Sequence, residues 1–178
     1  PIRTIATGIG QGITTVTPIA VARYISALVN GGTVYDAHVV QKVLDSKGNT
    51  VYETEPVVYN QLNVNDEYLN AIKEGMKDVI SGEDATTATR QFEDCIYKDQ
   101  LGGKTGTAQV NNINLENNSW FVAFAPYDKP EIAIVVFIPS GYAGGYSGYT
   151  VRVIAEHYLD QKYNTQTDEV PEKDSIVY

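Results

Sequence analysis

The stretch LGGKTGTAQV, residues 101–110, decides how this sequence is interpreted. Lys104 follows two glycines and precedes Thr105, Gly106 and Thr107, so a cation, two hydroxyls and an uncrowded backbone are adjacent. Because side chains two positions apart on a strand share a face, the two threonine hydroxyls are predicted to point the same way.

Three interpretations of GGKTGT differ in what its residues do. A phosphate-binding loop requires a glycine five positions before Gly103, where the chain has Lys98, and a helix afterwards, which AQVNNINLENN does not suggest. The second interpretation is an exposed strand in which glycine marks a bulge. The third is the anion-binding strand of a serine acyl transferase. There, a lysine and two hydroxyls hold a substrate carboxylate, and a backbone N–H stabilises an oxyanion.

Outward from this stretch, helical periodicity dominates upstream and strand patterns dominate downstream. We expect helices at 17–32, 65–82 and 149–163, a hairpin at 33–56 with its turn at 46–49, and strands at 104–110, 119–126 and 131–139. Loops are predicted at 1–12 and 140–148, and a short helix or a loop at 83–100. Helices followed by strands joined by tight turns predict an α+β fold, with a central antiparallel sheet flanked by helices.

Length and charge exclude several classes of protein. The 178 residues suffice for one domain, and the net charge of −9 argues against binding to nucleic acid. No segment approaches the ~20 apolar residues of a membrane span, and no secretory signal is recognisable. Because the first residue is not methionine, we expect a piece of a longer protein. Residues 1–163 are predicted to be structured, and the polar residues 164–178 to form a mobile tail.

The order of further motifs favours the third interpretation. GIGQGITTVTPIAVARYISALVNGG, residues 8–32, precedes GGKTGTAQ by roughly 70 residues, and SWFVAFAP and EIAIVVFIP follow. In this order the chain resembles the C-terminal half of a penicillin-binding protein transpeptidase domain, over roughly residues 4–163. It is most similar to the monofunctional class B enzymes of elongation, division or sporulation. The resemblance implies the serine transpeptidase or β-lactamase-like fold, with this chain as its C-terminal portion.

The resemblance also implies a catalytic set of which this chain holds one part. Of the motifs S-x-x-K, S-x-N and K-T/S-G, only the third is present, because no serine here is followed by the residues of the first two. By resemblance, Lys104 supports the electrostatics of the proton shuttle, and Thr105 and Thr107 bind the substrate carboxylate. The Thr107 N–H forms one arm of the oxyanion hole, and Gly106 keeps the approach open. The nucleophilic serine is expected upstream, in an N-terminal portion that packs against this sheet.

The reaction implied is acyl transfer through a seryl ester, from a stem peptide ending in D-Ala-D-Ala to the amine of a neighbouring stem. Expected partners are peptidoglycan stem peptides, β-lactam antibiotics, the N-terminal portion of the same protein and cell-wall synthesis proteins such as a glycosyltransferase. The expected location is the extracytoplasmic face of the bacterial cell membrane, with the anchor outside this chain. Two alternatives stay open: a β-lactam sensor domain and a non-catalytic cell-wall scaffold.

A few other residues invite functional hypotheses. Cys95 could be a buried small apolar residue, an exposed thiol or a zinc ligand, although a zinc site needs partners from elsewhere. No other cofactor is expected. His38 and His157 are predicted to have surface or packing roles, and Trp120 is predicted to anchor the core.

Overall fold

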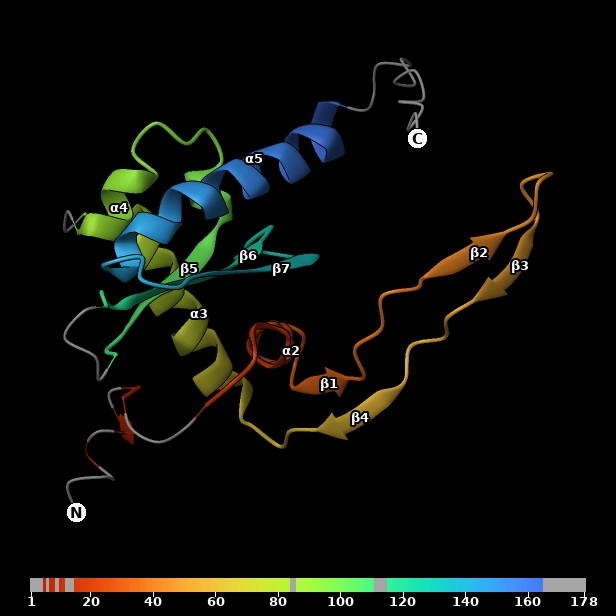
Figure 1. The fold of residues 1–178 in the computed structure, drawn as a ribbon, viewed down its shortest axis with the longest axis horizontal. Helices are drawn as coiled ribbons and strands as arrows, with labels where there is room; N and C mark the ends of the chain where they lie inside the picture. Colours follow the sequence, from red (N-terminus) through yellow and green to blue (C-terminus); the bar gives the residue numbers. More distant parts are fainter. Residues whose placement is uncertain are drawn as a thin grey trace.

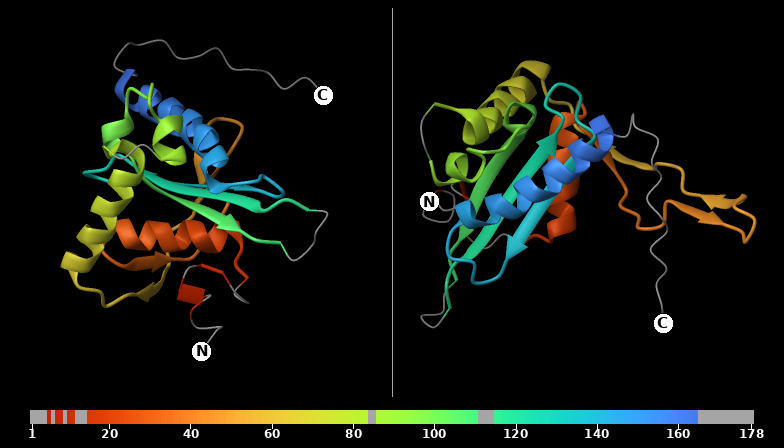
Figure 2. Two further views of the ribbon diagram at one scale, coloured as in Figure 1. Left: turned by 90° about the vertical axis from the view of Figure 1, so that its left-hand side faces the viewer. Right: turned by 90° about the horizontal axis from the view of Figure 1, so that it is seen from above.

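A three-stranded antiparallel sheet lies at the centre of the protein. The computed structural model describes residues 5, 7, 8, 10, 11, 15–83, 86–110 and 115–164. The strands follow the order β5 (Gly102–Ala108), β6 (Asn118–Ala125) and β7 (Ile132–Ile138). Figure 2 shows α2 (Pro18–Val29) along one face of the sheet and α5 (Ser147–Asn164) along the other. The predicted α+β architecture and its three strands are therefore confirmed.

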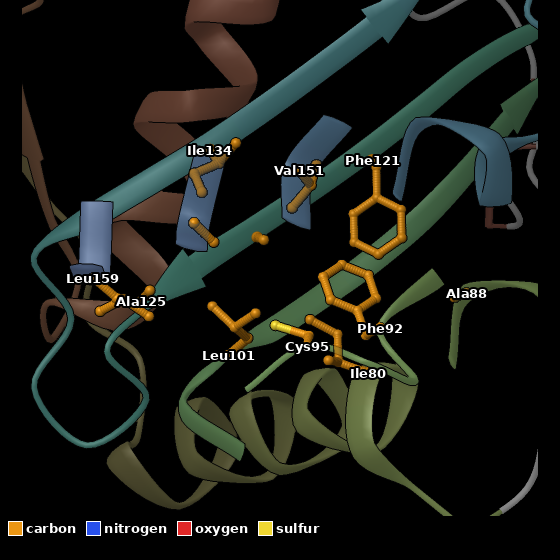
Figure 3. Close-up of a cluster of buried hydrophobic side chains, with 12 residues drawn as sticks. Ile80, Ala88, Phe92, Cys95, Leu101, Phe121, Ala125, Ile134, Val151 and Leu159 are labelled. Atoms are coloured by element: carbon orange, nitrogen blue, oxygen red, sulfur yellow. The ribbon is translucent and has the colours of Figure 1, made fainter. Parts of the chain in front are cut away.

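Both faces of the sheet carry a hydrophobic core. Odd-numbered residues of β6 face α5 and α4 (Thr87–Gln91), and Figure 3 shows Phe121 beside Phe92, with ring centroids 5.7 Å apart. On the other face, Phe124 packs with buried side chains of α2 and α3 (Asp66–Ser81). Because β6 is covered on both sides, its sequence reads as a nearly continuous apolar run.

The helices α2 and α3 begin at capping side chains and end at or just before glycines. The Thr17 side chain accepts a hydrogen bond from the N–H of Ala20, and α2 ends before Gly31, whose φ is +84°. Asn65 caps α3 in the same way by accepting from the N–H of Glu67. The ambiguous segment 83–100 contains α4 and a 3₁₀ turn, η1 (Lys98–Gln100).

A long two-stranded arm, residues 33–61, projects from the body of the molecule (Figure 1). Its outer ladder pairs β2 (Lys42–Leu44) with β3 (Thr50–Glu53), which confirms the predicted hairpin. Its inner ladder pairs β1 (Thr33–Tyr35) with β4 (Val58–Gln61), a strand beyond the predicted limit of the hairpin. The arm exposes many apolar side chains, among them Val39, Val51 and Tyr59.

The chain ends and the loop predicted at 140–148 differ from the sequence-based predictions in a few places. Most of the loop predicted at 1–12 lies outside the described residues, but Ile5, Thr7 and Gly8 are helical, so the prediction is wrong there. Asn164 belongs to α5, and residues 165–178 lie outside the described residues. The loop before α5 contains the 3₁₀ turn η2 (Gly144–Tyr146) and ends where α5 begins, at Ser147. Among the described helices, none has the length and hydropathy to cross a bilayer.

Candidate active site

The Lys-Thr-Gly-Thr run lies on β5, an edge strand that pairs with β6 alone among the described strands. The Gln11 side chain donates to the Thr107 carbonyl oxygen (3.0 Å) and accepts from the Gln109 N–H (3.4 Å). The N–H and C=O groups of Thr107 therefore point away from β6. Those of Thr105 do the same, because successive residues of a strand direct these groups to alternate sides and Thr105 is two positions away. The Thr107 N–H is thus directed to the free edge, where its predicted oxyanion role requires it.

The sheet register puts the lysine and the threonines on opposite faces. Lys104 lies opposite Val122, on the face of α2 and α3, whereas Thr105 and Thr107 lie opposite Phe121 and Ser119 on the face of α5. The lysine nevertheless reaches around the free edge. Its Nζ donates to the Thr105 carbonyl oxygen at 3.0 Å and lies 3.3 Å from Thr105 Oγ1. The predicted cation and hydroxyl are therefore brought together at the strand edge rather than on one face.

An apolar groove of about 450 Å³ runs along the lysine side of the sheet. Lys104 lies on it, and its walls come from α2, α3 and β6: Val21, Tyr24, Ile25, Leu28, Ile72, Gly75, Met76, Val79 and Val122. Ile72 lines this groove from α3 and is 41% exposed. This surface has the apolar character of a core without a covering layer.

The threonine side of β5 is covered by the loop that connects β7 to α5. The N–H of Gly144 donates to Thr107 Oγ1 at 2.9 Å. The Ser119 hydroxyl, directly opposite Thr107 on β6, donates to the carbonyl oxygen of Ala143 at 2.7 Å. The loop is therefore hydrogen-bonded to both strands beside the predicted carboxylate-binding hydroxyls.

Gly102 and Gly103 are required by packing. A Cβ at Gly102 would lie 2.4 Å from the ring of Phe124, and one at Gly103 would lie 2.7 Å from the ring of Phe121. Any side chain at either position would therefore displace a core aromatic residue. These glycines let the β5 backbone approach the core, and Lys104 follows directly.

Cys95 lies in the core and is only 4% exposed. Figure 3 shows it between Leu101 and Ile80. Burial raises the pKa of its thiol to about 11. In the described part of the chain no three His, Cys, Asp or Glu side chains are grouped so that they could hold a metal ion. The surroundings of Cys95 match the first of its three hypotheses, a buried small apolar residue.

The Cys95 thiol is expected to resist alkylation in the folded protein. Because its pKa rises from 9.0 to about 11, the thiolate fraction near pH 8 falls about 100-fold. Iodoacetamide modification of the peptide containing Cys95, followed by mass spectrometry, should be at least that much slower in buffer than in urea. Equal rates would show that the thiol is exposed.

The remaining candidates lie away from the Lys-Thr-Gly-Thr edge. His38 is an exposed residue of the arm, and His157 lies on α5 beside Gln161. Trp120 is half-buried against Phe137, with ring centroids 4.3 Å apart, so its prediction as a core anchor is wrong. Its position on β6 opposite Gly106 directs it to the face of α2, but it is not one of the side chains that pack into the core on that face.

Comparison with known proteins assigns the chain to a family. Residues 2–159 match the penicillin binding protein transpeptidase domain. The chain belongs to this family. Its relatives include the peptidoglycan D,D-transpeptidase MrdA of Haemophilus influenzae, which is 32% identical over 89% of this chain and 26% of that protein. Penicillin-binding protein 2A of Bacillus subtilis is 30% identical over 83% of this chain and 22% of that protein.

Solved structures of the family share the fold. PBP2 of Pseudomonas aeruginosa superposes with a TM-score of 0.69, at 25% identity, over 98% of this chain and 36% of that one. Penicillin-binding protein A of Mycobacterium tuberculosis, solved as an imipenem acyl-enzyme, gives a TM-score of 0.71 at 23% identity, over 86% and 33% of the two chains. The chain thus spans about a quarter of the curated relatives it matches, and the serine transpeptidase fold predicted for it is confirmed.

Sequence reasoning missed the residues that surround the transpeptidase motif. Gly144 lies in the loop predicted at 140–148, and Ser119 and Ser147 drew no functional prediction because neither begins an S-x-x-K or S-x-N motif. Both serines are fully buried, and their hydroxyls are hydrogen-bonded to each other. A buried serine on a strand and another at a helix start were the available signal, because buried hydroxyls need partners.

Proposed function

We propose that this chain is the C-terminal part of a peptidoglycan D,D-transpeptidase. The observation that carries the proposal is the free edge of β5, where the Lys104 ammonium, the Thr105 hydroxyl and the outward Thr107 N–H meet. A cation and N–H donors at an edge strand suit an acyl donor that carries a carboxylate and forms an oxyanion. An extended peptide can also pair with such an edge. Relatives named D,D-transpeptidases favour this function over a sensor or a scaffold.

The proposed reaction has two steps. A serine hydroxyl attacks the carbonyl carbon of the D-Ala-D-Ala bond, an ester forms, and the C–N bond breaks as the terminal D-Ala leaves with a proton on its nitrogen. The amine of a neighbouring stem then attacks the ester, a new amide forms, and the proton returns to the serine oxygen. In both steps Lys104 lowers the energy of the developing negative charge, and the Thr107 N–H donates to the oxyanion.

The serine is supplied by polypeptide upstream of this chain. No serine of the chain carries the S-x-x-K or S-x-N pattern, and the curated relatives are about four times as long. The groove beside Lys104 supports the same proposal, because its apolar walls are open along α2, α3 and β6. A helix with an apolar face that fills this groove would bring its own residues beside Lys104.

Location and partners follow the same proposal. The protein acts at the extracytoplasmic face of the cell membrane, on peptidoglycan stem peptides and β-lactams, together with a glycosyltransferase. PBP2 of Helicobacter pylori, 26% identical in sequence, is known in complex with MreC. A protein similar to MreC is therefore proposed as a further partner.

Fluorescent penicillin labelling and thioester turnover test the function together. We expect the full-length protein to be labelled, whereas residues 1–178 alone should not be labelled because the nucleophile is missing. The full-length protein should also turn over a stem-peptide thioester analogue. Labelling without turnover would favour the sensor, and absence of both would favour the scaffold.

A further inference from the structure

The loop between β7 and α5, residues 139–146, brings its backbone against the transpeptidase motif; we call it the glycine loop. A Cβ built on Gly144 would lie 2.5 Å from the carbonyl oxygen of Gly106 and 2.7 Å from its nitrogen. Both contacts are with backbone atoms, which cannot rotate away as a side chain can. Position 144 therefore admits only glycine while the loop stays in this place.

The close approach makes one hydrogen bond possible. The Gly144 N–H donates to Thr107 Oγ1 at 2.9 Å. A threonine hydroxyl has one proton and two lone pairs. When a fixed amide occupies one lone pair, the hydroxyl proton is left to donate elsewhere. The Thr107 residue is exposed, so a ligand at the strand edge can approach it.

The glycine loop is held at both ends, so the Gly144 amide is a fixed donor. Before Gly144, the N–H of Ser140 donates to Asn118 Oδ1 at 3.1 Å, and the carbonyl oxygen of Ala143 accepts from the Ser119 hydroxyl at 2.7 Å. After it, Ser147 shares a buried hydrogen bond with the same Ser119 hydroxyl. The first residues of β6 thus anchor the loop beside β5.

We propose that Gly144 is a positioning residue for acyl transfer: its amide orients the Thr107 hydroxyl to donate to the carboxylate of the acyl donor. The proposal rests on the proposed function and deepens it, because it explains how one carboxylate ligand is preset. Gly144 acts through Thr107, with no contact of its own to the donor. Its effect must therefore depend on the carboxylate and must vanish when the hydroxyl is removed.

The test uses the full-length protein with Gly144→Ala and Thr107→Val, alone and combined. Acylation is measured with a carboxylated penicillin and with its methyl ester. We expect each single variant to lose about 10- to 100-fold in the second-order rate with the carboxylated compound, the range for a hydrogen bond to a charged group. With the ester the loss should be under about 3-fold. The double variant should lose no more than the larger single loss, because the two residues act as one unit.

Two further variants separate positioning from general packing. Gly141→Ala is the matched control, since its Cβ would lie 2.8 Å from Ser119 Cβ and 2.9 Å from the Ile138 carbonyl oxygen, and none of its near contacts is with β5. This variant should destabilise the loop, but it should lower the acylation rates with the carboxylated penicillin and with its methyl ester by similar factors. Thr107→Ser retains the hydroxyl, so it should retain the wild-type ratio of the acylation rates with the two compounds. The proposal would be overturned if Gly144→Ala lowered the acylation rate equally with both compounds. It would also be overturned if Gly141→Ala lowered the rate with the carboxylated penicillin alone, as Gly144→Ala is expected to do.

Hydrogen exchange tests the contact even where Gly144→Ala fails to fold. Replacing Thr107 by valine should speed exchange of the Gly144 amide about 10-fold or more, and replacing it by serine should not. Unchanged exchange in Thr107→Val would contradict the hydrogen bond itself. If the wild-type protein shows no acylation by penicillin, the proposed function fails instead, whatever the Gly144 amide does.

Discussion

Replacing Lys104 by alanine in the full-length protein is expected to lower the rate of β-lactam acylation about 1,000-fold or more. The Nζ lies at the free edge of β5, beside the Thr105 carbonyl and hydroxyl oxygens. Removing a preorganised charge or donor from a site of this kind costs about 10²–10³ in rate, and disturbing the proton transfer adds to the loss. The residue is exposed, so the fold should be retained.

The matched control for this variant is Lys129→Ala, which removes an exposed lysine from the turn between β6 and β7. It should be acylated at the wild-type rate. Stopped-flow measurement with a chromogenic cephalosporin gives both rates, and the melting temperatures show whether each variant is folded. An acylation rate within 10-fold of wild type in a folded Lys104→Ala protein would refute the role given to the lysine.

Replacing Phe121 by alanine is expected to have the largest effect on stability. The side chain is fully buried and packs against Phe92 on the α5 face of the sheet. Truncating a buried phenylalanine costs about 3–5 kcal/mol, partly from lost burial and partly from the cavity. This is a large share of the ~5–15 kcal/mol that stabilises an ordinary domain.

Phe137→Ala is the matched comparison, because Phe137 lies on the next strand but is 36% exposed. Its loss should be about 1 kcal/mol, a typical value for a partly exposed site. Urea unfolding of the intact transpeptidase domain measures both free energies. If Phe121→Ala lowers the free energy of unfolding no more than Phe137→Ala does, Phe121 does not lie in the core of this face of the sheet.

Local patterns in the sequence were enough to place most elements. The helix predicted at 17–32 begins at its cap, Thr17, and the apolar runs around Phe121 and Ile134 form two of the predicted strands. These signals act over a few residues, through caps, side-chain periodicity and turn chemistry. The strand β4 was missed because it is defined by its pairing with β1, a partner more than 20 residues away.

The residues of the site were predicted because they are contiguous in the sequence. Their surroundings were not, because these come from segments far away along the chain. The threonines at 105 and 107 share a face, as strand alternation requires. Lys104 extends over an apolar groove whose shape depends on how α2 and α3 pack. Gly144 contacts Thr107, 37 positions away along the chain, because of how the glycine loop packs. Trp120 was misjudged for the same reason, since its burial depends on which helix covers its part of β6.

We propose that this chain supplies the Lys-Thr-Gly-Thr edge of an acyl-transfer site whose serine lies upstream. The most direct measurement is peptide mapping by mass spectrometry after the full-length protein reacts with benzylpenicillin. We expect one penicilloyl adduct, on a serine outside residues 1–178, which disappears when that serine is replaced by alanine. An adduct on Ser119, Ser147 or any other residue of this chain would contradict it, and so would the absence of any adduct.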